Sequence, residues 1–243
     1  MMLDIKNLHK YFGGIKAVDG CNFSIKQGAI TALIGPNGSG KSTVFHLISQ
    51  LEQEDSGKII FNKKNIAKST THEIARLGIS RTFQEVRLFK NLSIQDHLEI
   101  AMTQDDEKLC SSLFTKQKDK LSEMHALLKV VGLHKDLKTY VTDLSYGQRK
   151  LLDLAIALAK PHTLLMLDEP VAGVNPLIRK DIKALLKNLK KKGETILVIE
   201  HDMNFVMDLA DHIIVMDAGK VIAEGKPKEI QKNKKVLEAY LGE

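Results

Sequence analysis

Residues 35–43 of this chain read Gly35-Pro36-Asn37-Gly38-Ser39-Gly40-Lys41-Ser42-Thr43. This stretch matches the pattern G-x-x-x-x-G-K-[S/T] in full. Its glycines allow a tight backbone turn in which successive N–H groups face one anion, and a helix starting near Ser42 directs its positive end to the same point. We expect Lys41 to reach the β- and γ-phosphates of a nucleotide and the Ser42 hydroxyl to ligate Mg²⁺. The stretch therefore predicts a nucleotide-phosphate site between a strand and a helix.

A second candidate site lies where residues 164–169 read Leu164-Leu165-Met166-Leu167-Asp168-Glu169. An apolar run of this length is typical of a buried strand, and here it ends in two carboxylates. We expect Asp168 to hold the magnesium through water and Glu169 to polarise the attacking water, because phosphoryl transfer depends on positioning and charge neutralisation. Alone, such a strand end is a weak signal. Beside a complete phosphate loop it becomes a strong one.

A histidine follows another predicted strand, in the sequence Ile199-Glu200-His201-Asp202. A side chain at the carboxyl end of a parallel strand opens onto the crevice where ligands bind in such sheets. From there His201 could contact the γ-phosphate. A lone histidine is more often structural, so the residues by themselves leave both interpretations open.

The rest of the chain alternates apolar runs with helical patterns, which predicts an α/β fold with a parallel core. Short apolar runs predict strands over residues 2–8, 21–25, 29–34, 58–61, 163–167, 195–199 and 213–216. Apolar residues at helical spacing predict a mostly helical insert over 93–131 and helices after Ser145, from Pro176 to a stop at Gly193, and in the tail 227–243. A turn is expected at residues 217–220.

Composition limits the class of protein. With 243 residues, of which 43% are hydrophobic and 27% charged, the chain suits one domain, or one domain plus a subdomain. Cys21 and Cys110 are isolated, which fits a reducing compartment rather than a disulfide framework. Asp4 and Lys6 interrupt the N-terminus, and every apolar run is far below the ~20 residues of a membrane span. The net charge of +6 would permit contact with nucleic acid or anionic lipid, but the lysines fit the solvated face of a helix.

The sequence Leu144-Ser145-Tyr146-Gly147-Gln148 completes a familiar series. Together with the phosphate loop, Gln84, Asp168-Glu169 and His201, in their order along the chain, it resembles the ATP-binding cassette (ABC) family. The resemblance covers essentially the whole chain. It implies a P-loop NTPase core with a parallel sheet, an N-terminal antiparallel β subdomain and an inserted α-helical subdomain. The core would comprise residues 1–83 and 147–243, and the helical subdomain residues 84–146.

The resemblance also assigns roles. His201 looks like the family's switch histidine, and Gln84 looks like the glutamine that touches magnesium and the attacking water. Ser145, Gly147 and Gln148 would bind the γ-phosphate held by a second cassette, so that two cassettes close head-to-tail over two ATP molecules. An ordinary helix N-cap at Ser145 fits the local sequence equally well.

The chain departs from the family pattern at two positions, and a third is ambiguous. Tyr146 replaces the commoner second glycine of the signature, and Asn175 replaces the commoner aspartate of the loop that joins the two sites. We expect Tyr146 to be tolerated, because Gly147 still allows close approach of the backbone. Phe12 matches the aromatic residue that stacks on adenine, with Tyr11 as the alternative.

Four segments look like the corresponding segments in cassettes of branched-chain amino acid importers. They are residues 81–89, 144–148, 239–243 and the loop that contains Asn175. Such importers pair two cassettes, identical or not, with two transmembrane permeases and an extracytoplasmic substrate-binding protein, at the cytoplasmic face of the cell membrane. Cassettes of lipopolysaccharide export and of urea or amide uptake are the alternatives. A soluble ATPase acting on nucleic acid or protein usually carries two nucleotide domains, a coiled coil or zinc-binding inserts, which this sequence lacks. A scaffold without hydrolysis is disfavoured by Glu169 and His201.

One surface is expected to receive a permease helix. Residues 83–92 interleave apolar and basic side chains, as a helix-in-groove contact requires. The residues concerned are Val86, Arg87, Leu88, Phe89, Lys90 and Leu92. Ordinary packing inside the helical subdomain is the alternative for each apolar residue.

Overall fold

The computed structural model describes residues 1–103 and 117–241. The chain forms two compact units, the first comprising Met1–Arg81, His162–Glu169 and Leu186–Glu243, the second Thr82–Pro161 and Pro170–Leu185. Cys110 lies outside the described residues, as do Gly242 and Glu243 at the end of the chain. The helical subdomain predicted over residues 84–146 falls within the range of the second unit, and its boundaries stay a prediction.

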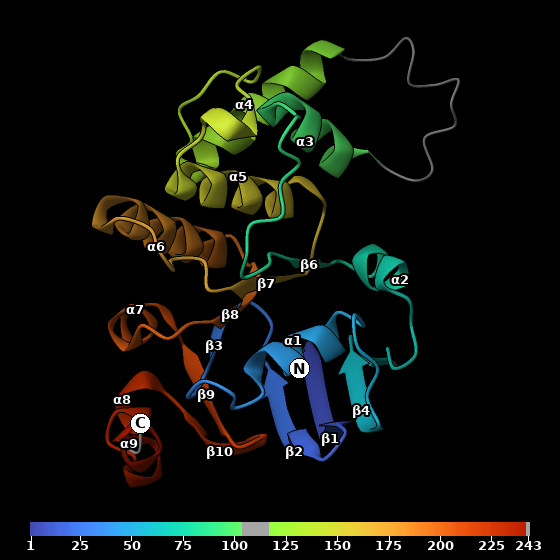
Figure 1. Ribbon diagram of the computed structural model, residues 1–243, viewed down its shortest axis with the longest axis vertical. Helices are drawn as coiled ribbons and strands as arrows, with labels where there is room; N and C mark the ends of the chain where they lie inside the picture. Colours follow the sequence, from blue (N-terminus) through green and yellow to red (C-terminus); the bar gives the residue numbers. More distant parts are fainter. Residues whose placement is uncertain (104–116, 242–243) are drawn as a thin grey trace. The chain divides into compact units, whose positions relative to one another are not determined.

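The first unit is built on a six-stranded sheet in the order β10-β9-β3-β8-β7-β6 (Figure 1). Its strands are β3 (Ile30–Ile34), β6 (Ile79–Arg81), β7 (Leu164–Asp168), β8 (Thr195–Ile199), β9 (His212–Asp217) and β10 (Lys220–Gly225). All neighbours pair in parallel except β10, which is antiparallel to β9. Every residue of β3, β7 and β8 is buried, as in parallel strands covered on both faces. The segments after these three strands therefore share one edge of the sheet, where ligands bind in such folds.

A four-stranded antiparallel sheet, in the order β2-β1-β4-β5, forms a second layer of this unit. Its strands are β1 (Leu3–Phe12), β2 (Ile15–Ile25), β4 (Ser56–Phe61) and β5 (Lys64–Asn65). Helix α1 (Lys41–Ile48) contributes Val44, Phe45, Leu47 and Ile48 to a hydrophobic core that also takes side chains from both sheets. Packing between two sheets, rather than intrinsic helix propensity, therefore holds this short helix in place. The predicted parallel core and the antiparallel β part are confirmed.

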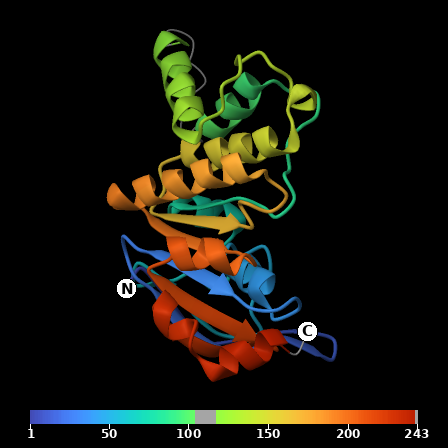
Figure 2. The ribbon, with the colours of Figure 1, turned by 90° about the vertical axis from the view of Figure 1, so that its left-hand side faces the viewer.

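Four further helices belong to the first unit: α2 (Thr71–Arg76), α7 (Met203–Leu209), α8 (Pro227–Ile230) and α9 (Lys234–Leu241). α8 contacts β9 and β10, and α9 contacts β10. Figure 2 draws this last part of the chain in red. Asp202 caps α7, because its carboxylate accepts a hydrogen bond from the Phe205 N–H at 2.8 Å. The helical tail predicted from residue 227 is confirmed up to Leu241.

The second unit is helical. It contains α3 (Ile94–Met102), α4 (Gln117–Val131), the 3₁₀ turn Val141–Asp143 and α5 (Tyr146–Ala159), and α6 (Pro176–Lys191) begins in it. α5 packs against both α3 and α4. Buried side chains at helical spacing line these contacts, among them Leu98 on α3, Met124 and Leu128 on α4, and Leu151 and Leu154 on α5.

Three strands differ from the sequence-based expectation, because β5, β6 and β10 were not among the apolar runs. β5 has only two residues, and both are exposed. β6 has three residues, one of them the charged Arg81. β10 carries Lys220 and Glu224, and its other residues are only partly buried. β6 and β10 lie at edges of the six-stranded sheet, so neither needs the continuous apolar sequence of the central strands.

Turns connect the strands largely as predicted. The turn expected at residues 217–220 is a two-residue hairpin turn with positive φ at Ala218 and Gly219, the geometry that matches the twist of the flanking strands. β1 and β2 run further than their apolar runs, to Phe12 and from Ile15, and register shifts interrupt their pairing. Irregular pairing disturbs the alternation of apolar and polar residues by which a strand is recognised. The predicted strands were therefore shorter than β1 and β2.

Candidate nucleotide-binding site

The phosphate loop connects β3 to α1 and requires glycine for steric reasons. Gly35 and Gly40 have φ values of 150° and 99°. A Cβ atom on Gly35 would lie 2.0 Å from the Met216 carbonyl oxygen, and one on Gly40 would lie 2.2 Å from that of Ala17. Backbone oxygens do not yield as flexible side-chain ends do, so the loop can follow this path only with glycine at both positions.

Lys41, the first residue of α1, turns back over the loop. Its ammonium donates hydrogen bonds to the carbonyl oxygens of Gly35 at 2.8 Å and Pro36 at 2.7 Å, and to Ser39 Oγ at 3.2 Å. The residue is only 5% exposed. Ser42, by contrast, is exposed. The structure therefore places a cation inside the loop and a hydroxyl at its surface. A phosphate group could accept bonds from both.

The acidic pair stands at the end of β7. Asp168 is its last residue and is buried; burial raises the pKa of its carboxyl group, and the nearby Arg81 guanidinium opposes that shift. Glu169 follows with φ 48°, an uncommon conformation for a residue other than glycine. The Glu169 N–H donates to the carbonyl oxygen of Ile199 at 3.0 Å, which fixes this turn against the end of β8.

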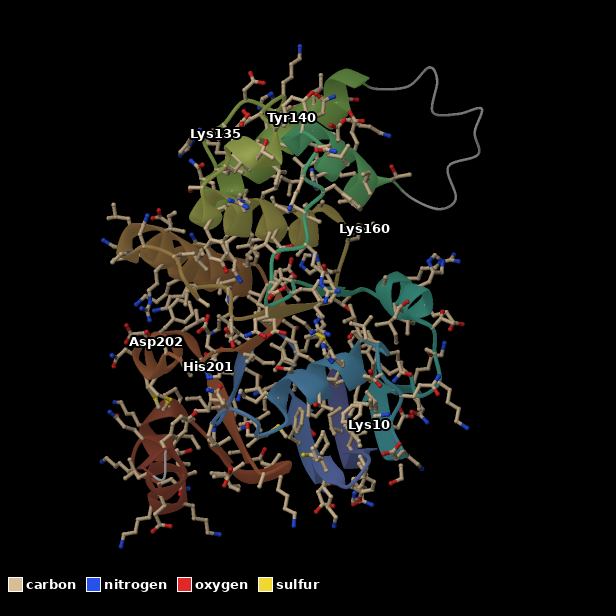
Figure 3. The ribbon with its side chains drawn as sticks, in the orientation of Figure 1. Lys10, Lys135, Tyr140, Lys160, His201 and Asp202 are labelled. Carbon is tan, nitrogen blue, oxygen red and sulfur yellow. The ribbon has the colours of Figure 1, made fainter. Side chains whose placement is uncertain are left out.

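His201 lies where the chain passes from β8 to α7, beside Asp202 (Figure 3). Its Nε2 is 2.6 Å from Glu169 Oε1, so the ring donates to the carboxylate when Nε2 carries the hydrogen. The Glu169 side chain is 13% exposed and that of His201 is 41% exposed. The structure thus brings together two residues that the sequence placed on different strands. Backbone strain at Glu169 and a short contact to an exposed histidine are features of functional sites.

The aromatic candidates end β1. The Tyr11 hydroxyl is 2.7 Å from His9 Nδ1 and 3.4 Å from Asp19 Oδ1, and its N–H donates to Asp55 at 2.6 Å. The Phe12 ring is 45% exposed, and the Lys10 ammonium lies 5.1 Å from its centroid. Tyr11 is therefore tied to neighbouring polar groups, while the exposed Phe12 ring suits stacking on a flat ligand.

The predicted signature begins α5 in the second unit. Ser145 Oγ accepts from the Gln148 N–H at 3.3 Å, while the Gln148 side chain accepts from the Ser145 N–H at 3.0 Å. This reciprocal capping box is the ordinary N-cap that the local sequence also allowed. A Cβ on Gly147 would lie 2.6 Å from Ile178 Cδ1, so helix α6 passes close to the glycine.

Two further residues of the second unit have a clear local role. Asn175 precedes α6, and its side-chain oxygen accepts from the Ile178 N–H at 3.0 Å. An aspartate could make the same cap, which gives a physical reason why the asparagine is tolerated here. Gln84 is exposed in the segment after β6, and its main-chain carbonyl accepts from Lys150 Nζ at 2.9 Å.

Comparison with known proteins gives this arrangement a family. The model of the family described as "ABC transporter" matches residues 18–172. The chain belongs to the ABC transporter family. A second family model, described as "Branched-chain amino acid ATP-binding cassette transporter", matches residues 220–243. The chain is accordingly an ATP-binding cassette, and like others of its kind it binds and hydrolyses ATP.

Individual proteins resemble the cassette over nearly their whole length. The high-affinity branched-chain amino acid transport ATP-binding protein BraF of Pseudomonas aeruginosa is 37% identical, with 100% of this chain and 98% of that protein covered. The crystal structure of the ADP conformation of MJ1267, an ATP-binding cassette of an ABC transporter, superposes with a TM-score of 0.87 at 35% identity, covering 100% of this chain and 99% of that one. The dimeric structure of the bacterial ABC transporter cassette MJ0796 gives 0.82 at 25% identity, covering 93% and 99%.

The residues of the cassette fit a magnesium ion that arrives with ATP. Within residues 1–103 and 117–241, no three His, Cys, Asp or Glu side chains gather into a metal cage. Magnesium is usually held by one or two protein oxygens together with substrate phosphates, so a cage is not required. The exposed Ser42 hydroxyl and the Asp168 carboxylate are donors of this kind.

Another finding concerns the membrane. In the described part of the cassette, no helix is both long and apolar enough to cross a bilayer.

Three charged residues with a clear structural role were not predicted from the sequence. Arg81 donates to Asp168 Oδ2 at 3.2 Å, and Lys150 holds the Gln84 carbonyl. Asp153 lies beside Lys150 on α5, and burial raises its pKa to about 7, against the opposing effect of the Lys150 ammonium. A charge within an otherwise apolar strand or helix face was the signal available for all three.

Proposed function

We propose that this cassette powers the uptake of branched-chain or similar amino acids through separate permease subunits. The match of residues 220–243 to a branched-chain amino acid cassette model carries the proposal. The resemblance to BraF over the whole chain supports it. The motifs of the cassette are those of ATP chemistry, so the transported molecule would be selected by its partners.

In the proposed mechanism the phosphate loop binds the nucleotide. Lys41 exchanges its bonds to the Gly35 and Pro36 carbonyls for bonds to the β- and γ-phosphates. The loop residues Asn37, Gly38, Ser39, Gly40 and Thr43 line the phosphates with Lys41 and Ser42, and Phe12 stacks on the adenine. Ser42, Asp168 and Gln84 would hold magnesium, which would supply charge neutralisation on the phosphates.

Glu169 and His201 carry the hydrolytic step. Glu169 Oε1 accepts a hydrogen bond from the attacking water and polarises it. The water oxygen, made more nucleophilic, then faces the γ-phosphate. His201 donates to Glu169 Oε1 at 2.6 Å and keeps that carboxylate in one orientation. Once ATP is bound, the exposed His201 ring is available for the γ-phosphate. The short contact supports this shared role for two residues from different strands.

The proposed partners follow from the family to which the chain belongs. Ser145, Gly147 and Gln148 would contact the γ-phosphate of a second cassette, identical or not, in a head-to-tail dimer. Two transmembrane permeases would each contact a cassette at residues 83–92, where Phe89 is 63% exposed. An extracytoplasmic substrate-binding protein would deliver the amino acid, and the cassette would lie at the cytoplasmic face of the cell membrane. No role for nucleic acid is proposed.

The substrate can be tested in the source cells with a Glu169→Gln allele. Uptake of radiolabelled leucine, isoleucine and valine should fall to the level of a deletion strain, because ATP binds but is not turned over. A chromosomal Arg76→Lys allele, in exposed helix α2, serves as the matched control. Normal branched-chain uptake with a defect in urea uptake or in lipopolysaccharide export would refute the substrate and point to one of those cassettes.

The chemistry is tested with the purified protein. Glu169→Gln should keep ATP affinity but lower the turnover number by at least about 100-fold, as expected for loss of a general base. The variant should also accumulate as an ATP-bound dimer in size-exclusion chromatography. Turnover at the wild-type rate would refute the role of Glu169.

A further inference from the structure

A buried arginine lies against the acidic end of β7. Arg81 ends β6, and its side chain is 7% exposed. The guanidinium donates through Nη2 to Asp168 Oδ2 at 3.2 Å and through Nη1 to Ser49 Oγ at 2.9 Å, and it lies 5.4 Å from the centroid of the Phe45 ring. Burying a guanidinium is costly unless it is paired and hydrogen-bonded, so these contacts are what make its position tenable.

These contacts join two separate parts of the nucleotide site. Ser49 directly follows α1, the helix that begins in the phosphate loop, and its hydroxyl donates to the Phe45 carbonyl at 2.8 Å. Asp168 ends β7, which pairs in parallel with β6. One side chain therefore spans from the far end of the phosphate-loop helix to the acidic strand. A guanidinium is a planar fork, so it fixes the direction of both partners, which a single ammonium does less well.

We propose, on the basis of the magnesium role proposed above for Asp168, that Arg81 is the positioning residue of the magnesium site. Arg81 holds the Asp168 carboxylate in one orientation and at a fixed separation from α1, before any ion arrives. The alternative is a purely structural ion pair, whose loss would lower stability alone. The location of the pair decides between them, because it stands at the carboxyl edge of the parallel strands, where ligands bind, and not in the middle of the core.

The proposal is tested by titrating Mg²⁺ at a fixed concentration of a fluorescent ATP analogue and recording binding. Partners that orient a metal-ligating carboxylate typically account for 10–100-fold in metal affinity, so Arg81→Met should raise the Mg²⁺ midpoint about tenfold. Binding of the analogue in EDTA should stay within about twofold of wild type, because the contacts within the phosphate loop are unchanged. A merely structural role would leave the midpoint where it is.

Graded variants make the test independent of folding. Arg81→Lys keeps the charge but not the fork and should shift the midpoint by less than Arg81→Met, while Ser49→Ala removes only the link to α1 and should shift it by about two- to threefold. Arg76 is an exposed arginine of α2, and Arg76→Met should leave the Mg²⁺ midpoint unchanged. Thermal unfolding shows which variants are folded. If Arg81→Met does not fold, Arg81→Lys and Ser49→Ala decide the question.

Two results would overturn the proposal in different ways. An unchanged midpoint in folded Arg81→Met, or in both graded variants, would reduce Arg81 to a structural residue and leave the proposed function intact. An Asp168→Asn variant with the wild-type midpoint would instead remove the magnesium role of Asp168. In that case the inference falls with the proposed role on which it rests.

Discussion

Helices α1 and α5 both begin at a motif predicted to bind phosphate, but they begin in opposite ways. α1 starts after Gly40, a left-handed residue, and among the described residues no side chain caps it. α5 starts after Ser145, whose side chain and that of Gln148 close a capping box. Neither helix has an acidic residue in its first turn, whereas α2 and α3 do. In both helices the positive end of the helix dipole is therefore not neutralised by an acidic residue. Only at the start of α5 are backbone N–H groups capped by the helix's own side chains.

The difference suggests that the two helix starts meet a phosphate at different stages, one within a single cassette and the other only after a second cassette binds. A glycine before α1 lets the loop come close to a phosphate without a competing side chain, so the site is formed before ATP arrives. At α5 the capping box stabilises the helix while the cassette is alone. A phosphate presented by a second cassette would have to replace that box. We therefore expect the phosphate loop to bind phosphate within one chain, and the signature to become a phosphate site only when two cassettes assemble.

The largest effect is expected from the glycine that begins α1. Gly40→Ala would place a Cβ 2.2 Å from the Ala17 carbonyl oxygen in a residue with φ 99°. We expect the free energy of unfolding, measured in urea, to fall by about 4 kcal/mol, because strain and a backbone clash combine.

The matched change at α5 should be mild. In Gly147→Ala the new Cβ meets the Ile178 side chain, whose flexible terminal Cδ1 atom is nearest, at 2.6 Å. The higher helix propensity of alanine offsets the crowding, so the loss should stay below about 1 kcal/mol. Equal losses in Gly40→Ala and Gly147→Ala would show that the two helix starts are not as different as their geometry indicates.

The next effect concerns the buried lysine that each helix carries. Lys41 and Lys150 are each 5% exposed, and each donates to loop carbonyls. Lys41→Ala should weaken ATP binding about 100-fold, close to 3 kcal/mol, as expected for loss of a charged hydrogen-bond donor to phosphate. Lys150→Ala should change ATP affinity less than about threefold, because its ammonium holds Gln84 and not the phosphate loop. Equilibrium titration with a fluorescent ATP analogue compares the two, and similar losses would contradict the distinction.

The start of α1 could be predicted from sequence because its pattern is local. Glycines at fixed spacing before Lys41 determine the turn and the helix together, without information from distant residues. The acidic pair after a buried strand was accessible for the same reason. The ABC resemblance supplied Gln84 and the signature, which local patterns alone would have left as an ordinary loop and an ordinary N-cap.

Contacts between distant segments were not predictable in this way. The 2.6 Å contact of His201 with Glu169 depends on the pairing of β7 with β8 and on the positive φ of Glu169. Arg81 sits in a strand too short to recognise, and its role appears only when β6 lies beside β7. Strand order is a property of the whole sheet, so a single sequence does not reveal which polar residues meet at its edge.

A smaller effect concerns the pH dependence of α5. Burial raises the pKa of Asp153 to about 7, above its value in the unfolded chain. The folded state therefore binds this proton more tightly, and the stability that it confers is complete below about pH 4 and is lost as pH rises through 7. Because Asp153 is only partly buried and solvent screens part of the effect, we expect the loss to be about 2 kcal/mol. Asp153→Asn should flatten the stability curve between pH 4 and 7, and an unchanged slope would contradict the raised pKa.

A small effect on stability, and the sharpest test of the comparison, is expected at Ser145. Ser145→Ala removes the cap and should lower the free energy of unfolding by about 1 kcal/mol, while Ser145→Asp keeps an acceptor for the Gln148 N–H and should leave it nearly unchanged. Hydrolysis should follow the opposite order, since a carboxylate repels an incoming γ-phosphate and an alanine does not.

Measuring urea unfolding and ATP turnover on both variants therefore separates the two roles of one hydroxyl. If Ser145→Asp hydrolyses ATP at the wild-type rate, no phosphate approaches the start of α5. The capping box seen here would then be its permanent state, and the contrast with α1 would be one between two ways of beginning a helix. If Ser145→Asp is stable but inactive, the box must open during the cycle, and its cost of about 1 kcal/mol becomes part of the barrier to closing the dimer.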